Sequence, residues 1–204
     1  MRENRPPSEI PELVVEDASE WRRWLEDHRG DTAGVWLALA RGGSEATTRL
    51  THPAALEEAL ALGWIDGQAR RRDDTSWVIH FTPRRRRSPW SKRNTAIAER
   101  LITEGRMHAA GAAEVERAKA DGRWQAAYAG PATIGVTADL AAALDASPTA
   151  KENFGRLTAQ NRYAILYRLQ SAKRVKTRER RVADFVAMLE RGETIYPQRA
   201  SLAR

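Results

Sequence analysis

The segment from Gly63 to Asn94 constrains the fold more than any other part of the chain, and it reads GWIDGQARRRDDTSWVIHFTPRRRRSPWSKRN. Within it, residues 64–72 alternate in polarity, and residues 76–82 are rich in amino acids that favour strands. The pair Asp73-Asp74 between these runs is typical of a turn. The segment therefore predicts an antiparallel β-hairpin, followed by an irregular arginine-rich stretch between two prolines.

Residues 34–40 form a short apolar run, which predicts a buried strand beside the hairpin. Ser19 is a suitable N-cap for a first helix, and Thr51-His52-Pro53 opens a second helix with proline at a tolerated position. Gly42-Gly43-Ser44 predicts a turn, and residues 1–13 predict a loose arm. The expected fold class is α+β, with a small antiparallel sheet packed by helices.

The chain becomes helical in pattern after Asn94, and a glycine- and proline-containing stretch predicts a linker over residues 129–137. This linker would separate a body over 1–128 from a helical C-terminal subdomain over 138–197. The helices predicted after the linker lie at about 138–146, about 158–172 and 178–191, the last with Thr177 as its N-cap.

Two basic blocks stand out in a chain whose formal net charge is +7. Residues 84–93 hold six basic residues and no acidic one, and residues 151–181 hold ten basic and two acidic residues. Clustered positive charge attracts phosphates and other anions, so a small anion and a nucleic acid are both candidate partners. The alternative for the second block is a solvated helix face.

The composition excludes several kinds of site. The chain has no cysteine, which rules out disulfides, thiolate metal sites and cysteine nucleophiles. Its four histidines are isolated in sequence, and it has no nucleotide-binding or zinc-protease motif, so we predict neither a metal nor a cofactor. The N-terminus lacks the apolar region of a secretory signal, and no apolar run is long enough to span a membrane. We therefore expect a cytoplasmic protein.

Asp66 and His80 are the two catalytic candidates, although no known reaction motif includes them. Asp66 lies beside aromatic residues in the predicted hairpin, where a carboxylate can act as a base or hold a cation, or can instead bond the backbone of a turn. His80 has an unperturbed pKa near neutrality and can act as a general base, or can instead be a packed histidine of the sheet.

Trp90 and the arginine run are the best candidates for binding. An indole in a basic loop can stack on a ligand ring or cation, or can pin the loop to the body, and guanidinium groups bind phosphate or carboxylate in a bidentate manner. The predicted ligand is a small anionic or aromatic molecule. The residues expected to contact it are Trp64, Asp66, Gln68, His80, Arg84, Trp90 and Asn94.

Several short motifs occur in a fixed order along most of the chain, from about Trp21 to Pro197. They are G-W-I-D-G at 63–67, F-T-P-R at 81–84, W-S-K-R-N at 90–94, E-G-R-M at 104–107, A-K-A-D-G-R-W at 118–124, S-A-K-R at 171–174 and T-R-E-R-R at 177–181. In sequence and order they resemble the YdeI/OmdA family, whose members are described as bacteriocin-protection or OmpD-associated proteins. The resemblance implies a bacterial protein of stress response or toxin protection. It implies no particular reaction, so a nucleic-acid-binding protein and an enzyme acting on a small molecule stay as alternatives.

Overall fold

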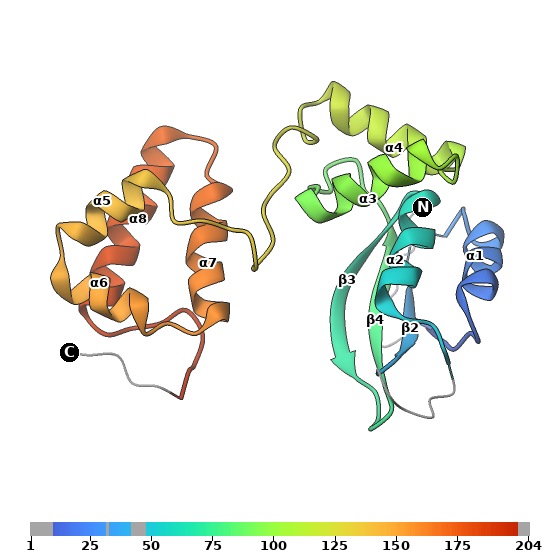
Figure 1. Cartoon of the computed structure of the whole chain (residues 1–204), viewed down its shortest axis with the longest axis horizontal. Coiled ribbons are helices and arrows are strands. Elements are labelled where there is room, and N and C mark those ends of the chain that lie inside the picture. Colours follow the sequence, from blue (N-terminus) through green and yellow to red (C-terminus); the bar gives the residue numbers. More distant parts are fainter. Residues whose placement is uncertain (1–9, 32, 42–47, 200–204) are drawn as a thin grey trace. The chain divides into compact units, whose positions relative to one another are not determined.

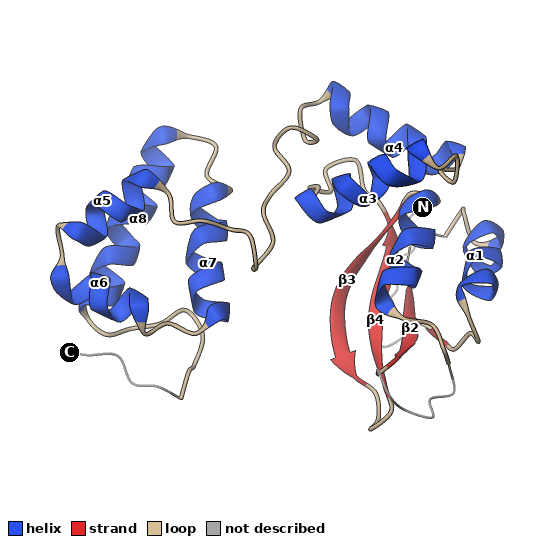
Figure 2. Cartoon of the chain, viewed as in Figure 1, coloured by secondary structure: helices blue, strands red, loops and turns tan. Residues whose placement is uncertain are grey.

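The computed structural model describes residues 10–31, 33–41 and 48–199, and the chain divides into two compact units (Figure 1). The N-terminal unit is Met1–Ala127 and the C-terminal unit is Tyr128–Arg204. The N-terminal unit combines a small sheet with helices, whereas the described secondary structure of the C-terminal unit is helical (Figure 2). The predicted α+β class is therefore confirmed. The turn predicted at 42–44 lies outside the described residues.

The sheet of the N-terminal unit has four strands in the order β1-β2-β4-β3. The predicted hairpin and the predicted apolar strand are confirmed, because β4 pairs antiparallel with both β3 and β2. The sheet is nevertheless mixed, not purely antiparallel as predicted, because a short strand in the expected loose arm pairs parallel with β2. The strands are β1 (Glu12–Leu13), β2 (Val35–Ala40), β3 (Trp64–Arg71) and β4 (Ser76–Pro83).

One face of the sheet packs against α1 (Ala18–Asp27) and α2 (His52–Ala61). Trp21 of α1 is fully buried, lies 5.4 Å from the ring of Phe81, and donates a hydrogen bond from Nε1 to the carbonyl of Ala55 in α2. The N-cap of α1 is Asp17 and not Ser19 as predicted. The Asp17 carboxylate reaches two backbone N–H groups of the first turn, which a charged acceptor satisfies better than a hydroxyl.

The N-terminal unit also contains the helices α3 (Lys92–Thr103) and α4 (Ala109–Ala120). The start of α4 lies directly against the C-terminal end of α2. A Cβ atom built on Gly111 would lie 2.3 Å from the carbonyl oxygen of Ala61 and 2.7 Å from that of Leu60. Glycine at this position therefore permits the close approach of the two helices.

We expect Gly111→Ala to destabilise the N-terminal unit by about 1–3 kcal/mol, because backbone atoms of α2 must move to admit the methyl group. Alanine's better helix propensity, worth about 1 kcal/mol, offsets part of this cost. Chemical denaturation followed by tryptophan fluorescence measures the change. Gly30→Ala is the matched control, since no atom lies within 4 Å of its built Cβ. Equal stability of the two variants would contradict the tight packing of α2 on α4.

The C-terminal unit has a core of its own, formed by residues that include Leu140, Phe154, Ile165 and Leu189. Over the described residues of this unit, four helices enclose the core, where the sequence predicted three. The helix missed in the prediction, α6, contributes few buried apolar side chains and therefore has little periodicity to recognise. The helices are α5 (Ala138–Asp145), α6 (Pro148–Gly155), α7 (Ala159–Gln170) and α8 (Val175–Glu190).

The last helix begins earlier than predicted, because Arg174 and not Thr177 is its N-cap. The N–H of Arg178 donates to the carbonyl of Arg174 at 3.0 Å, and the Arg178 side chain makes tertiary contacts. Its guanidinium pairs with the Asp139 carboxylate at 2.5 Å and donates to the carbonyl of Leu169 at 2.9 Å. These contacts tie the first turn of α8 to α5 and to the end of α7. Among the residues that the structure describes, no helix is long and apolar enough to cross a membrane.

Candidate functional site

The arginine run starts with a residue that is buried. Arg84 is 6 % exposed, and its backbone N–H donates to the carbonyl of Gly63 at 2.9 Å. Its guanidinium carbon lies 3.5 Å from the centre of the Trp90 ring, and its Nη1 donates to the carbonyl of Pro89 at 3.3 Å. Arg84 is the first residue of the loop 84–90, and it closes the loop by contacting the last two residues. A cation over an indole ring is a favourable arrangement.

Trp90 holds the same loop against the body of the unit. Its side chain is 1 % exposed and packs on the Trp124 ring with the centroids 4.9 Å apart. Arg123 adds a hydrogen bond from Nη1 to the carbonyl of Ser88 at 2.8 Å, and the Ser88 hydroxyl accepts from the N–H of Arg85. Of the two roles considered for Trp90, the buried position fits the one that pins the loop.

Five cationic side chains are presented to solvent by this arrangement. Among the described residues none of them forms an ion pair with a carboxylate, and the first turn of α3 contains no acid. The last two lie at the positive end of the α3 dipole, where cations are unfavourable and an anion is favourable. We call this group the cationic loop; it consists of Arg85, Arg86, Arg87, Lys92 and Arg93.

Two further residues predicted to bind a ligand are buried in this structure. Trp64 is 1 % exposed and packs edge-on against Trp24, with centroids 5.8 Å apart. Asn94 is 6 % exposed, and its backbone N–H donates to the Ser91 hydroxyl that caps α3. Neither the Trp64 ring nor the Trp90 ring therefore presents a face to a ligand.

Asp66 forms a pair with a residue that the sequence did not indicate. Its Oδ2 lies 3.0 Å from Nε2 of His52, the first residue of α2, and both side chains are partly exposed. A β-bulge follows Asp66 and contains the exposed Gln68. A carboxylate bonded to an imidazole selects one tautomer for proton transfer, and it equally ties the first turn of α2 to β3. Sequence spacing gave no signal for His52 beyond its place at a helix start.

His80 lies on the other face of the sheet. The register places Asp66 opposite Phe81, and adjacent strand residues point to opposite faces, so the two catalytic candidates do not converge. His80 Nε2 lies 3.2 Å from the carbonyl of Ala33, and its ring stacks on Trp36. Burial lowers the pKa of His80, and the charge of Arg85 lowers it further against the opposing effect of Ala33.

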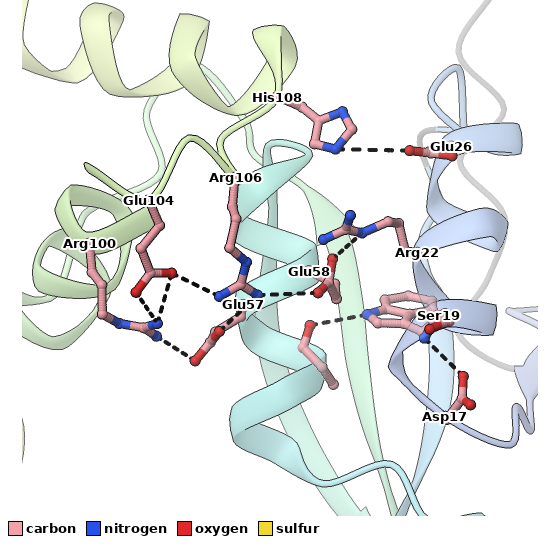
Figure 3. A network of polar contacts seen from close by, with 12 residues as sticks. Asp17, Ser19, Arg22, Glu26, Glu57, Glu58, Arg100, Glu104, Arg106 and His108 are labelled. Atoms are coloured by element: carbon pink, nitrogen blue, oxygen red, sulfur yellow. Dashed lines mark hydrogen bonds and ion pairs between the residues drawn. The ribbon is translucent and has the colours of Figure 1, made fainter. Parts of the chain in front are cut away.

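The E-G-R-M motif at 104–107 belongs to a network of ion pairs that connects three helices (Figure 3). Arg106 reaches Glu57 at 3.2 Å and Glu104 at 2.9 Å, and Arg22 of α1 reaches the buried Glu58 at 2.6 Å. Acidic and basic side chains of this network neutralise one another. Structural contacts therefore account for the E-G-R-M motif. In the part of the chain that the structure describes, no group of three or more histidine, cysteine, aspartate or glutamate side chains is arranged to hold a metal ion.

Two family models match the two units of this α+β protein. Residues 13–114, half of the chain, match a model described as "Domain of unknown function (DUF8412)", and the chain belongs to that family. Residues 133–192 match the model described as "Bacteriocin-protection, YdeI or OmpD-Associated". The predicted YdeI/OmdA resemblance is thus confirmed for the C-terminal unit. The motifs between residues 63 and 107 fall within the region that the other family model matches. The YdeI/OmdA match therefore covers less of the chain than predicted.

Comparison with curated proteins finds no match, and comparison with solved structures finds none.

Proposed function

We propose that the chain is a bacterial, cytoplasmic YdeI/OmdA-like protein of stress response or bacteriocin protection, and that its N-terminal unit binds an anion on the cationic loop. The description of the C-terminal domain supports the first part. One observation carries the second part. The buried contact between Arg84 and Trp90 fixes a loop whose next three arginines are exposed and, among the described residues, without a carboxylate partner.

A fixed loop favours binding for a physical reason. Ordering a long, flexible side chain at an interface costs about 0.5–1.5 kcal/mol, and a backbone that is already held reduces the total cost of ordering. Guanidinium groups also match the geometry of phosphate and carboxylate oxygens better than ammonium groups do. The ligand class proposed is therefore an anion with several oxygens, such as a phosphate ester or a polyphosphate.

The proposed surface differs from the single pocket that the motifs predicted. Trp64 and Trp90 are in the core, and Asp66 lies beside His52 instead of beside the arginines. An anion would contact Arg85, Arg86 and Arg87 without touching either tryptophan. Of the predicted binding residues, Arg84 and Trp90 would act by holding the loop in place.

Replacing Arg85, Arg86 and Arg87 together with alanine tests this proposal. We expect the affinity for tripolyphosphate at low salt to fall about 3- to 150-fold, because each of the three exposed charges contributes about 0.2–1 kcal/mol. Isothermal titration calorimetry measures the change. The matched control removes three exposed charges from the C-terminal unit, as Lys173→Ala, Arg174→Ala and Lys176→Ala. Equal losses of affinity in both triple variants would show that net charge alone accounts for the binding, and the proposed site would be wrong.

Nucleic-acid binding is the second candidate function, and the second basic block of residues 151–181 favours it. Each neutralised phosphate releases counterions, so oligonucleotide affinity would fall steeply with salt. Tripolyphosphate and an oligonucleotide compared on the same two triple variants separate the candidates. A small-anion site loses affinity only with the arginine substitutions, whereas nucleic-acid binding that uses both basic blocks responds to both sets.

A further inference from the structure

All four tyrosines of the chain lie in the C-terminal unit, and they gather around α7. The Tyr167 ring lies 5.2 Å from the Tyr128 ring and 5.7 Å from the Tyr163 ring. The guanidinium of Arg168 lies 6.0 Å from the ring of Tyr196. Aromatic residues of one type are therefore concentrated beside a cation in one place.

Arg168 and three of the tyrosines, all but Tyr128, line a cavity of about 450 Å³, which is within the range of small-ligand sites, about 300–1,000 Å³. Its lining contains no carboxylate. The helical positions that contribute to it recur at intervals of three and four, so they form one face of α7, while the opposite face packs in the core. The lining residues are Gln160, Tyr163, Ala164, Tyr167, Arg168 and Tyr196. We call this cavity the tyrosine groove.

Partly buried hydrogen bonds hold the outer wall of the groove in place. Asn161 is 1 % exposed, and its side-chain carbonyl accepts from the N–H of Tyr196 at 2.8 Å. Its amide nitrogen donates to the carbonyl of Tyr196 at 3.0 Å. The backbone of Tyr196 is thereby fixed, although its side chain is 39 % exposed. An exposed aromatic ring on a fixed backbone is suited to contact with a ligand.

The charge of the segment that follows α7 indicates the class of ligand. The basic block supplies exposed cations just past the end of α7, at Lys173, Arg174 and Lys176, which have no ion pair with a carboxylate among the described residues. Flat aromatic faces beside a cationic track are the arrangement with which proteins bind single strands, where bases stack and phosphates meet the cations. A duplex keeps its bases stacked inside and would leave the tyrosines unused.

We infer that the tyrosine groove is a stacking site for the bases of single-stranded nucleic acid, with Lys173, Arg174 and Lys176 contacting its phosphates. This site lies in the other unit from the cationic loop and is independent of it. A short polyphosphate lacks the aromatic rings that the groove would bind.

Fluorescence anisotropy with a labelled single-stranded DNA of about 12 nucleotides tests the inference. We expect Tyr163→Leu and Tyr196→Leu, each made in the full chain, to weaken binding about 5- to 150-fold, because stacking contributes that much for each base. Tyr163→Phe and Tyr196→Phe keep the rings and are expected to bind like the wild type. The losses should persist when Arg85, Arg86 and Arg87 are replaced by alanine, which separates this site from the cationic loop.

The salt dependence provides a second reading of the same titration. Replacing Lys173, Arg174 and Lys176 should flatten the dependence of affinity on salt, whereas the leucine variants should keep the wild-type slope. Unchanged affinity in both leucine variants would overturn the inference, and so would equal affinity for a duplex. If a leucine variant instead converts a dimer to a monomer in sedimentation, the groove binds a second copy and the inference is wrong. If Tyr163→Leu does not fold, the result for Tyr196→Leu decides, because Tyr196 is exposed.

Discussion

Trp90→Ala is expected to lower the free energy of unfolding of the N-terminal unit by about 3–5 kcal/mol, the usual cost of truncating a large buried aromatic side chain. The indole is 1 % exposed and packs between the Arg84 guanidinium and the Trp124 ring. Its removal would leave a cavity and would also remove the aromatic face that Arg84 covers. Anion binding should fall too, because the loop would lose the contacts that hold it.

Tryptophan fluorescence during urea denaturation measures this loss selectively, because all seven tryptophans lie in the N-terminal unit. Trp90→Phe is the matched control. It keeps an aromatic ring under Arg84 and should retain most of the stability and the anion affinity. The opposite result is equally clear: a Trp90→Ala protein that unfolds like the wild type but loses its ligand would make Trp90 a ligand contact, and its role as an anchor would be wrong.

Asn161→Ala is expected to destabilise the C-terminal unit by about 1–3 kcal/mol. The Asn161 amide bonds both backbone groups of Tyr196, and each of these two partly buried hydrogen bonds contributes about 0.5–1.5 kcal/mol. The transition of the C-terminal unit, followed by far-UV circular dichroism, should move to lower urea concentration. The tryptophan transition of the N-terminal unit should not move.

Gln160→Ala is the control for the change in stability alone, since Gln160 also lines the tyrosine groove. It is the exposed neighbour of Asn161 on α7, and its loss should change stability by no more than about 0.5 kcal/mol. Asn161→Ala should also weaken single-strand binding by releasing Tyr196. A protein that keeps its stability while Asn161 is alanine would show that the C-terminal segment is held by other contacts.

Periodicity made much of the fold predictable. Alternation over 64–72 and 76–82 indicated the hairpin, and the apolar run at 34–40 indicated the strand beside it. Two short elements were not predicted, because they hold too few buried residues for a hydrophobic pattern to repeat. Strand β1 has two residues, and α6 buries only a few side chains of its eight residues. Two helix starts were misplaced by two or three residues, because the N-caps are Asp17 for α1 and Arg174 for α8.

The candidate site was predictable in composition but not in geometry. Four consecutive arginines indicated an anion site, yet nothing in the run distinguishes the buried Arg84 from its exposed neighbours. That difference depends on Trp90 and Trp124, which come together only in the fold. His52 was missed for the same reason, since its partner Asp66 is on another element. The tyrosines likewise meet through α7 and the C-terminal segment, not through a motif.

Nuclear magnetic resonance mapping of tripolyphosphate binding is the most direct test of the central claim that the cationic loop binds anions. The two-dimensional amide spectrum of the full chain would be recorded during a titration at low salt. We predict shifts concentrated at Arg85, Arg86 and Arg87 and in the first turn of α3, and absent when the three arginines are alanine. Shifts confined to residues 173–176 of the C-terminal unit, or no localised shifts at all, would contradict the claim.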